Sequence, residues 1–201
     1  HVATHESCYR LVRRPQMLKL YPSFPMSHVA DMPDVLAEID AFRAELAIHF
    51  NTFDPGDVDE KNLLEQAISA AKEGHDFISA AMATPEGPET FDVPVKQVLD
   101  IAGDVDGQIY MRDFRLIDQC DMICSYIPQL PGGMPGLSSG VERELQHAFE
   151  HGKQVYVVWK PAKSPSPFIT ETATKVFDST SDAIEHFEAQ GMCPKVGLFG
   201  D

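Results

Sequence analysis

The sequence predicts an α/β domain in which a central parallel β-sheet is covered by helices on both faces, a three-layer sandwich. Three observations support this fold class. Short apolar runs alternate along the chain with longer segments of helical periodicity, which is typical of βαβ units. Two of the runs, 121–128 and 153–161, are apolar over most of their length, as expected of strands buried on both faces. The 201 residues, 43% of them hydrophobic, suit one domain with a substantial core.

The first half of the chain begins with a predicted strand at 17–24, which ends in a proline-rich turn. Asp31 and Pro33 then open a predicted helix whose apolar residues keep a helical spacing. A short second strand is predicted within 49–57, where the chain runs into a turn. These elements predict a first βαβ unit.

The next region is predicted as one helix followed by an irregular insertion. Residues 59–82 are rich in Ala and Leu, which favours a helix with a candidate break at Gly74. Residues 84–107 contain three prolines and three glycines, so we expect an irregular insertion there. Residues 1–16 are interpreted as an N-terminal extension, equally the end of an upstream segment, ahead of one domain over 17–201.

The second half of the chain repeats the alternation of helices and strands. The predicted elements are a helix at 108–120, a central strand at 121–128, a loop at 129–140, a helix that ends at Gly152, a strand at 153–161, a loop at 164–168, and a strand and last helix within 174–190.

Charge and composition exclude several classes of function. Lys and Arg number 16 against 31 Asp and Glu, a net charge of −15, which argues against a partner that is a nucleic-acid polymer. A small phosphorylated ligand needs only a few local donors and is not excluded. No apolar run has the length of a membrane span, and nothing resembles a signal peptide.

The four cysteines predict buried, reduced thiols rather than a redox or metal centre. They are Cys8, Cys120, Cys124 and Cys193, and the central pair is four residues apart, which is not the CxxC spacing. Free cysteines of this kind behave as small apolar residues. We therefore expect a cytoplasmic protein.

The stretch SSGVERELQHAF, residues 138–149, contains more carboxylate than a helix start needs. Ser139 and Glu142 have the spacing of a capping box. Val141, Leu145, Ala148 and Phe149 form the predicted apolar stripe. Neither feature accounts for Glu144. Because it lies in the first turns of a helix, we expect the helix dipole to hold its carboxylate ionised, as a nucleophile requires.

The same helix ends in HAFEH, which fits the inverted zincin motif H-x-x-E-H through His147, Glu150 and His151. Both histidines lie in the last turn, where cationic side chains suit the helix dipole. We therefore predict no metal site from this motif. Asp118 and Asp121, at the end of the preceding helix, are interpreted as solvated charges.

Three segments, KLYPSFPMS, RDFRLIDQCDMICSYI and SSGVERELQHAFEHGKQVYVV, together resemble the nucleoside 2-deoxyribosyltransferase superfamily, which includes the 2′-deoxynucleoside 5′-monophosphate N-hydrolases. The resemblance implies a flavodoxin-like fold and cleavage of the N-glycosidic bond of a nucleoside or its monophosphate. It implies Glu144 as the nucleophile and Asp113 as the general acid and base. Because two carboxylates suffice for this chemistry, no cofactor or metal is expected.

The resemblance also implies a substrate pocket and an assembly. Ser138, Ser139 and Gly140 lie beside a helix N-terminus that suits an anion such as a 5′-phosphate. The segment after the first strand adds further candidates for substrate binding: Tyr21, Phe24, Pro25 and Met26. A homo-oligomer is expected, with the pocket completed by a neighbouring subunit.

Three questions remain open at this point. The first loop has the sequence FPMSH, without the arginine of the hydrolases' phosphate clamp, whereas Ser138 matches the hydrolases. Nucleoside and nucleotide substrates, and transfer and hydrolysis, therefore remain alternatives. A different class of function is also open, a non-catalytic nucleotide-binding sensor domain of a larger protein.

Overall fold

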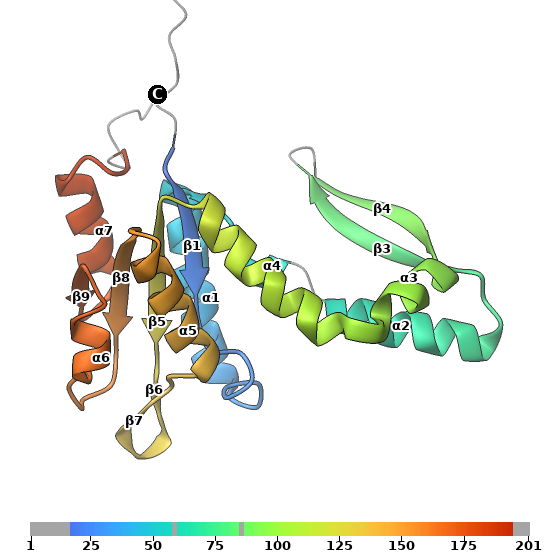
Figure 1. Cartoon of the computed structure of the whole chain (residues 1–201), viewed down its shortest axis with the longest axis horizontal. Coiled ribbons are helices and arrows are strands. Elements are labelled where there is room, and N and C mark those ends of the chain that lie inside the picture. Colours follow the sequence, from blue (N-terminus) through green and yellow to red (C-terminus); the bar gives the residue numbers. More distant parts are fainter. Residues whose placement is uncertain (1–16, 58–59, 85–86, 195–201) are drawn as a thin grey trace, which may run out of the picture.

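The computed structural model describes residues 17–57, 60–84 and 87–194 of the chain. Among them, one parallel sheet is formed by β1 (Lys19–Ser23), β2 (Asn51–Thr52), β5 (Met122–Ile127), β8 (Gln154–Trp159) and β9 (Lys175–Phe177). The strand order is β2-β1-β5-β8-β9, and every neighbouring pair is parallel (Figure 1). This is the flavodoxin-like order, so the predicted fold class is confirmed.

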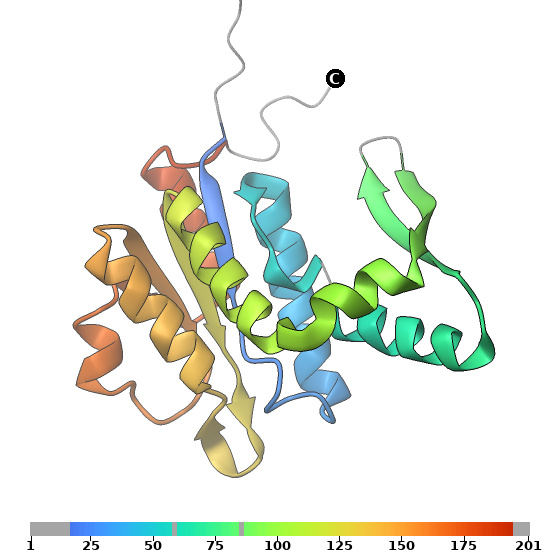
Figure 2. The same cartoon turned by 45° about the vertical axis from the view of Figure 1, so that its right-hand side comes forward.

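Helices cover both faces of the sheet, as Figures 1 and 2 show. One face carries α1 (Pro33–His49) and α7 (Thr180–Ala189), and the other carries α4 (Val105–Gln119), α5 (Ser139–Glu150) and the short α6 (Pro167–Thr170). Alternate residues of β5 divide between the two layers. Met122, Cys124 and Tyr126 pack with α1 and α7, whereas Ile123 and Ile127 pack with α4 and α5. The two apolar faces of one strand thus hold the three layers together.

An arm formed by α2 (Glu60–Glu73), β3 (Phe77–Thr84), β4 (Gly87–Pro94) and α3 (Val95–Ile101) projects from the sheet (Figures 1 and 2). It has a small core of its own, formed by Ala67, Ala70, Ile78, Val95 and Val98. The helix α4 begins in the arm and ends beside the sheet. The prediction of an irregular insertion at 84–107 is wrong, because the described residues of this range form regular elements, chiefly β4, α3 and the start of α4.

The single helix expected at 59–82 is wrong beyond Glu73. Gly74 takes a φ of 78°, the left-handed conformation that ends helices, so the candidate break is the end of α2. From Phe77 to Thr84 the chain pairs with β4 as an antiparallel hairpin. Both strands of an isolated hairpin are edge strands, which accommodate proline without losing an interior hydrogen bond. Pro88 and Pro94, two of the prolines that suggested an irregular segment, are therefore compatible with β4.

Smaller differences concern the ends of elements. The predicted loop at 129–140 contains a short hairpin of β6 (Gln129–Leu130) and β7 (Met134–Pro135), joined by the 3-10 turn η3 (Pro131–Gly133). The predicted loop at 164–168 runs into α6. The turn after β2 is the 3-10 turn η1 (Pro55–Asp57), and a second one, η2 (Ala102–Asp104), precedes α4. The extension at 1–16, with Cys8, and the tail at 195–201 lie outside the described residues.

The described cysteines, Cys120, Cys124 and Cys193, are free and buried, as predicted. Within the described residues, no helix has both the length and the apolar character needed to cross a membrane.

Candidate active site

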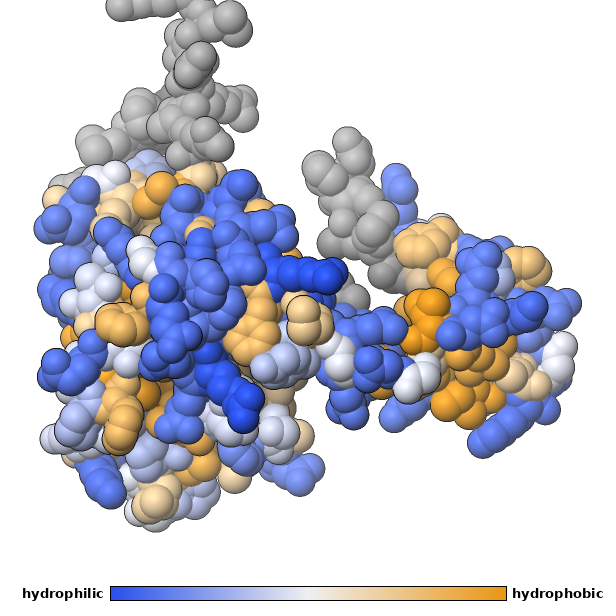
Figure 3. Space-filling view, viewed as in Figure 1, coloured by the Kyte–Doolittle hydropathy of each residue, from blue (hydrophilic) through white to orange (hydrophobic). Residues whose placement is uncertain are grey.

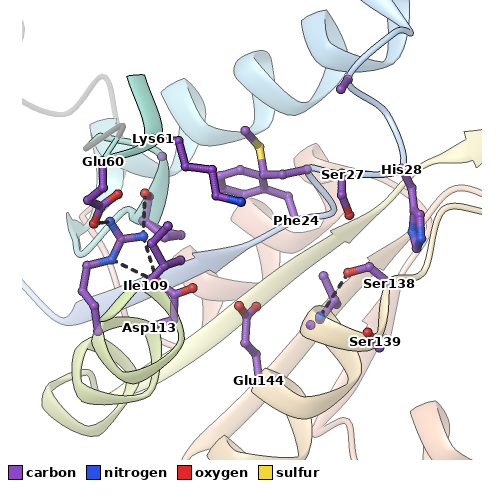
Figure 4. Close-up of a pocket in the computed structure, with 17 residues that line it drawn as sticks. Phe24, Ser27, His28, Glu60, Lys61, Ile109, Asp113, Ser138, Ser139 and Glu144 are labelled. Carbon is purple, nitrogen blue, oxygen red and sulfur yellow. Dashed lines mark hydrogen bonds and ion pairs between the residues drawn. The ribbon is translucent and has the colours of Figure 1, made fainter. Parts of the chain in front are cut away.

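A cavity of about 570 Å³ lies at the carboxyl ends of β1 and β5 (Figure 4). These strands are neighbours at the switch point of the sheet, where open α/β sheets bind ligands. Its lining comes from the segment after β1 (Phe24, Met26, Ser27, His28, Ala30), from the turn after β2 and the start of α2 (Pro55, Gly56, Glu60, Lys61), from α4 (Ile109, Arg112, Asp113) and from the start of α5 (Ser138, Ser139, Gly140, Val141, Glu144).

The start of α5 differs in detail from the prediction. Ser138, not Ser139, is the N-cap, and its hydroxyl accepts the backbone N–H of Val141 at 3.2 Å. Glu142 is therefore one position too late for a capping box, and it is exposed. The apolar stripe is also narrower than expected, because Phe149 is 51% exposed. The helix is thus capped by Ser138, and its first residues line the cavity.

Glu144 is held by two hydroxyl groups of β1. The Tyr21 hydroxyl donates to Glu144 Oε1 at 3.1 Å, and the Ser23 hydroxyl donates to Oε2 at 2.5 Å. Tyr21 and Ser23 are fully buried and two residues apart, so they lie on the same face of the strand. Burial and the neighbouring carboxylates raise the pKa of Tyr21 far above its usual range, so it remains a hydrogen-bond donor. Figure 4 shows Glu144 pointing into the cavity.

Burial opposes the expected ionisation of Glu144. Burial raises its pKa from the usual 4.5 to about 7, and the negative charge of Asp113 adds to the rise. The hydrogen bonds from Ser23 and Tyr21 act in the opposite direction, but desolvation outweighs them. Near neutral pH the carboxyl group therefore exists in both protonation states, which is typical of groups that exchange protons or attack during catalysis.

Asp113 is the second carboxylate of the cavity. Its Oδ1 accepts from Arg112 Nε at 3.1 Å and from Nη2 at 2.9 Å. The Arg112 guanidinium also bonds Glu60 and the carbonyl oxygen of Pro55. Burial raises the pKa of Asp113, and the Glu60 charge adds to this, while Arg112 lowers it. A smaller hollow of about 310 Å³ is also lined by both Asp113 and Glu144.

Seven of the nine residues predicted for the site line the cavity. They are Glu144, Asp113, Ser138, Ser139, Gly140, Phe24 and Met26. The other two are not part of its lining. Tyr21 lies beneath Glu144 and contacts the carboxylate instead, and Pro25 is buried. Tyr21 thus has a different role from the one predicted, since it supports the proposed nucleophile.

The prediction missed Ser23, Arg112, Glu60 and Lys61. Ser23 shares a strand face with Tyr21, so the period of two along a strand would have indicated it. Arg112 adjoins Asp113 in sequence, but its role depends on Glu60, which reaches it from the start of the arm. No sequence signal indicates that α2, which begins with Glu60, packs beside α4, which carries Arg112.

This arrangement combines a carboxylate with a near-neutral pKa, a second carboxylate and an apolar wall. The wall includes Phe24, Met26 and Ile109, and it suits a flat or apolar group of a ligand. Two carboxylates facing one cavity are the minimum for glycosidic-bond chemistry, one as nucleophile and one as acid and base.

A scan against models of known protein families and a search of curated proteins each give no match. Among solved structures, the chain is similar to a crystal structure of Sir2 in complex with the inhibitor EX-527, 2′-O-acetyl-ADP-ribose and a deacetylated p53 peptide. The likeness has 10% sequence identity and a TM-score of 0.33, and it covers 87% of this chain and 94% of that chain. A likeness at this level carries no argument about function, and the fold assignment rests on the strand order.

Proposed function

We propose that the protein cleaves the N-glycosidic bond of a nucleoside through a covalent glycosyl–Glu144 intermediate. The observation that carries the proposal is the environment of Glu144. It projects into the cavity, two buried hydroxyls hold its oxygens, and its pKa is about 7. The resemblance to the nucleoside 2-deoxyribosyltransferase superfamily supports the same assignment of Glu144 and Asp113.

In the first step, a carboxylate oxygen of Glu144 bonds to C1′ of the sugar while the bond from C1′ to the base nitrogen breaks. The bonding electrons stay on the base, which takes the proton of the Asp113 carboxyl group. Asp113 suits this role by position, because it faces the same cavity as Glu144, and burial raises the pKa of its carboxyl group. The transition state has oxocarbenium character, which the Glu144 carboxylate stabilises.

In the second step, water or a second base attacks C1′ and releases Glu144. The attacking group gives its proton to Asp113, which restores the starting protonation. Tyr21 and Ser23 fix the rotamer of Glu144 through both steps. The reaction balances with these two carboxyl groups alone, so it requires neither a metal ion nor an organic cofactor.

The charges of the cavity favour an uncharged nucleoside over its 5′-monophosphate. Arg112 is bonded to Glu60, Asp113 and the Pro55 carbonyl, and Lys61 pairs with Asp106 at 2.9 Å. A phosphate that contacted Arg112 or Lys61 would have to displace one of these partners, and it would also meet three carboxylates of the lining. The helix N-terminus at Ser139 and Gly140 remains as a site for neutral sugar hydroxyls.

The deciding experiment incubates the protein with deoxynucleosides, ribonucleosides and their 5′-monophosphates, with and without an acceptor base. We expect release of free base, or exchange of bases, from nucleosides faster than from monophosphates. Glu144→Gln is the inactive variant and Glu142→Gln the matched control, since Glu142 is an exposed glutamate on the same helix. Base release from none of the substrates contradicts the proposal. Multiple turnovers exclude the sensor alternative, whereas stabilisation by a nucleotide without turnover favours it.

We further propose a homo-oligomer in which the arm is the contact surface and a neighbour completes the pocket. The arm exposes large apolar side chains, among them Ile68, Phe77, Phe91, Leu99 and Ile101. Figure 3 shows a hydrophobic area on the arm. Contiguous exposed apolar surface often marks an interface. Sedimentation of the wild type and of Ile101→Glu tests this. A wild-type monomer at micromolar concentration contradicts it.

The free, buried cysteines support a reducing compartment, such as the cytoplasm.

A further inference from the structure

Three side chains of metal-binding type meet where the C-terminal halves of α4 and α5 pack together. Asp118 comes from α4, His147 lies in the last turn of α5, and His151 is the C-cap of that helix. One ligand atom from each lies within 4.8 Å of the others. Glu150, the acid of the H-x-x-E-H motif, is not part of this group, since it accepts a hydrogen bond from Gln146 at 2.8 Å. The spatial cluster therefore differs from the sequence motif.

Contacts within the structure fix the orientation of the imidazole rings of His147 and His151. His151 Nδ1 lies 2.8 Å from the backbone oxygen of His147, so Nδ1 donates and the lone pair of Nε2 is available. A ligating histidine in proteins commonly donates its other nitrogen in this way. The His147 ring lies between the rings of His151 and Phe114, with centroids at 4.1 and 4.7 Å. These contacts restrict rotation of the ring that faces Asp118.

We propose that Asp118, His147 and His151 bind a divalent transition cation of the Zn²⁺ type, which links α4 to α5. Two imidazole nitrogens and one carboxylate oxygen leave a fourth tetrahedral position for water. Metal–ligand distances of about 2.0–2.1 Å place tetrahedral ligands roughly 3.3 Å apart. Asp118 Oδ1 and His147 Nε2 are now 2.7 Å apart, so the ion separates this pair slightly and draws His151 closer.

Cation binding changes the protonation of His147. Its Nε2 now faces the Asp118 carboxylate, and a metal ligand needs the lone pair of that nitrogen. The ring proton therefore moves to Nδ1, or an imidazolium releases one proton to solvent. A neighbouring cationic side chain, Lys153, donates to the backbone oxygens of Asp118 and Cys120 at 2.9 and 2.6 Å. The net charge of −15 favours cation binding in general.

The site is separate from the cavity, because none of its three residues lines it. It is nevertheless on the two helices that carry Asp113 and Glu144. A cation that joins α4 to α5 stabilises the native packing of both helices. The binding proposal does not depend on the proposed activity.

The test is titration of the chelator-treated full chain with ZnCl₂, by calorimetry and by NMR of the histidine rings. We expect saturable binding of one Zn²⁺ whose ring signals assign to His147 and His151, and a higher melting temperature with Zn²⁺. Asp118→Asn and His151→Ala should each weaken binding by at least the roughly 10–100-fold typical of an outer-shell partner. Glu150→Gln is the matched control and should bind as the wild type does.

Asp118 and His151 are exposed, so these variants should fold, which circular dichroism checks. The proposal is overturned if no saturable binding occurs, or if binding persists unchanged in both variants. Loss of binding in Glu150→Gln but not in Asp118→Asn would instead assign the ion to the sequence motif.

Discussion

The helices α4 and α5 are in contact, and at each end of this contact a carboxylate of α4 lies near a titratable residue of α5. One end is partly buried and the other is exposed to solvent. At the cavity, Asp113 and Glu144 are partly buried, and desolvation raises the pKa of both. At the far end, Asp118 is 49% exposed and bonds His147 at 2.7 Å. The comparison teaches that burial, rather than residue type or helix, separates a carboxylate suited to catalysis from one suited to a surface ion pair or a metal ligand.

The largest expected effect is on turnover. Glu144→Gln keeps the size of the side chain and one acceptor oxygen for the hydroxyls of β1 but cannot attack C1′, so we expect base release to fall by at least about 10³-fold. Glu142→Gln should keep nearly normal turnover. A mass increase on Glu144 with a 2-fluorinated nucleoside would identify the adduct directly. Near-normal turnover of Glu144→Gln would remove it as the nucleophile.

The next effect links the two carboxylates of the cavity. Asp113→Asn removes the proton donor, which should lower turnover by about 10²-fold or more. It also removes a negative charge that raises the pKa of Glu144, so that pKa should fall below about 7. Carbon-13 NMR titration of the Glu144 carboxyl group measures this shift. An unchanged Glu144 pKa would show that the two groups do not interact.

Stability should depend on pH through Glu144. Its pKa is about 7 when folded and 4.5 ordinarily, so the folded state binds the proton more tightly. The wild type therefore loses stability as pH rises from about 4.5 to 7. Glu144→Gln does not titrate, so at pH 8 it should be more stable than the wild type by about 3 kcal/mol, with most of the difference gone by pH 5. Urea unfolding at both pH values checks this, and an equal difference at both contradicts it.

The elements of the sheet layer were predictable because their signals are local. The buried runs that form β5 and β8 and the periodicity of α1 and α5 are visible in short windows of sequence. The arm was not predictable from local signals, because β3 is Ala-rich and becomes a strand only by pairing with β4. Its pairing partner supplies hydrogen bonds that local propensity does not encode.

In the candidate active site, too, local features were predictable and contacts between distant residues were not. Glu144 and Asp113 were predicted from motifs that resemble a known family, and the helix start from its serines. The hydroxyls that hold Glu144 depend on the register of β1 against α5, and the Asp118–His147 contact depends on how α4 packs on α5. Such contacts join residues more than twenty positions apart, and the sequence alone does not specify them.

The smallest expected effect concerns the exposed end of the comparison, in buffer free of metal ions. Asp118→Asn keeps the size of the side chain and a hydrogen-bond acceptor for His147 but removes the charge. Because the pair is largely in contact with solvent, we expect the free energy of unfolding to change by no more than about 1 kcal/mol. Raising the salt concentration should shrink the difference further, since exposed charges are screened. Urea unfolding of both proteins at low and high salt measures this. A loss well above that magnitude, independent of salt, would show that this end is electrostatically buried too, and the contrast between the two ends would fail.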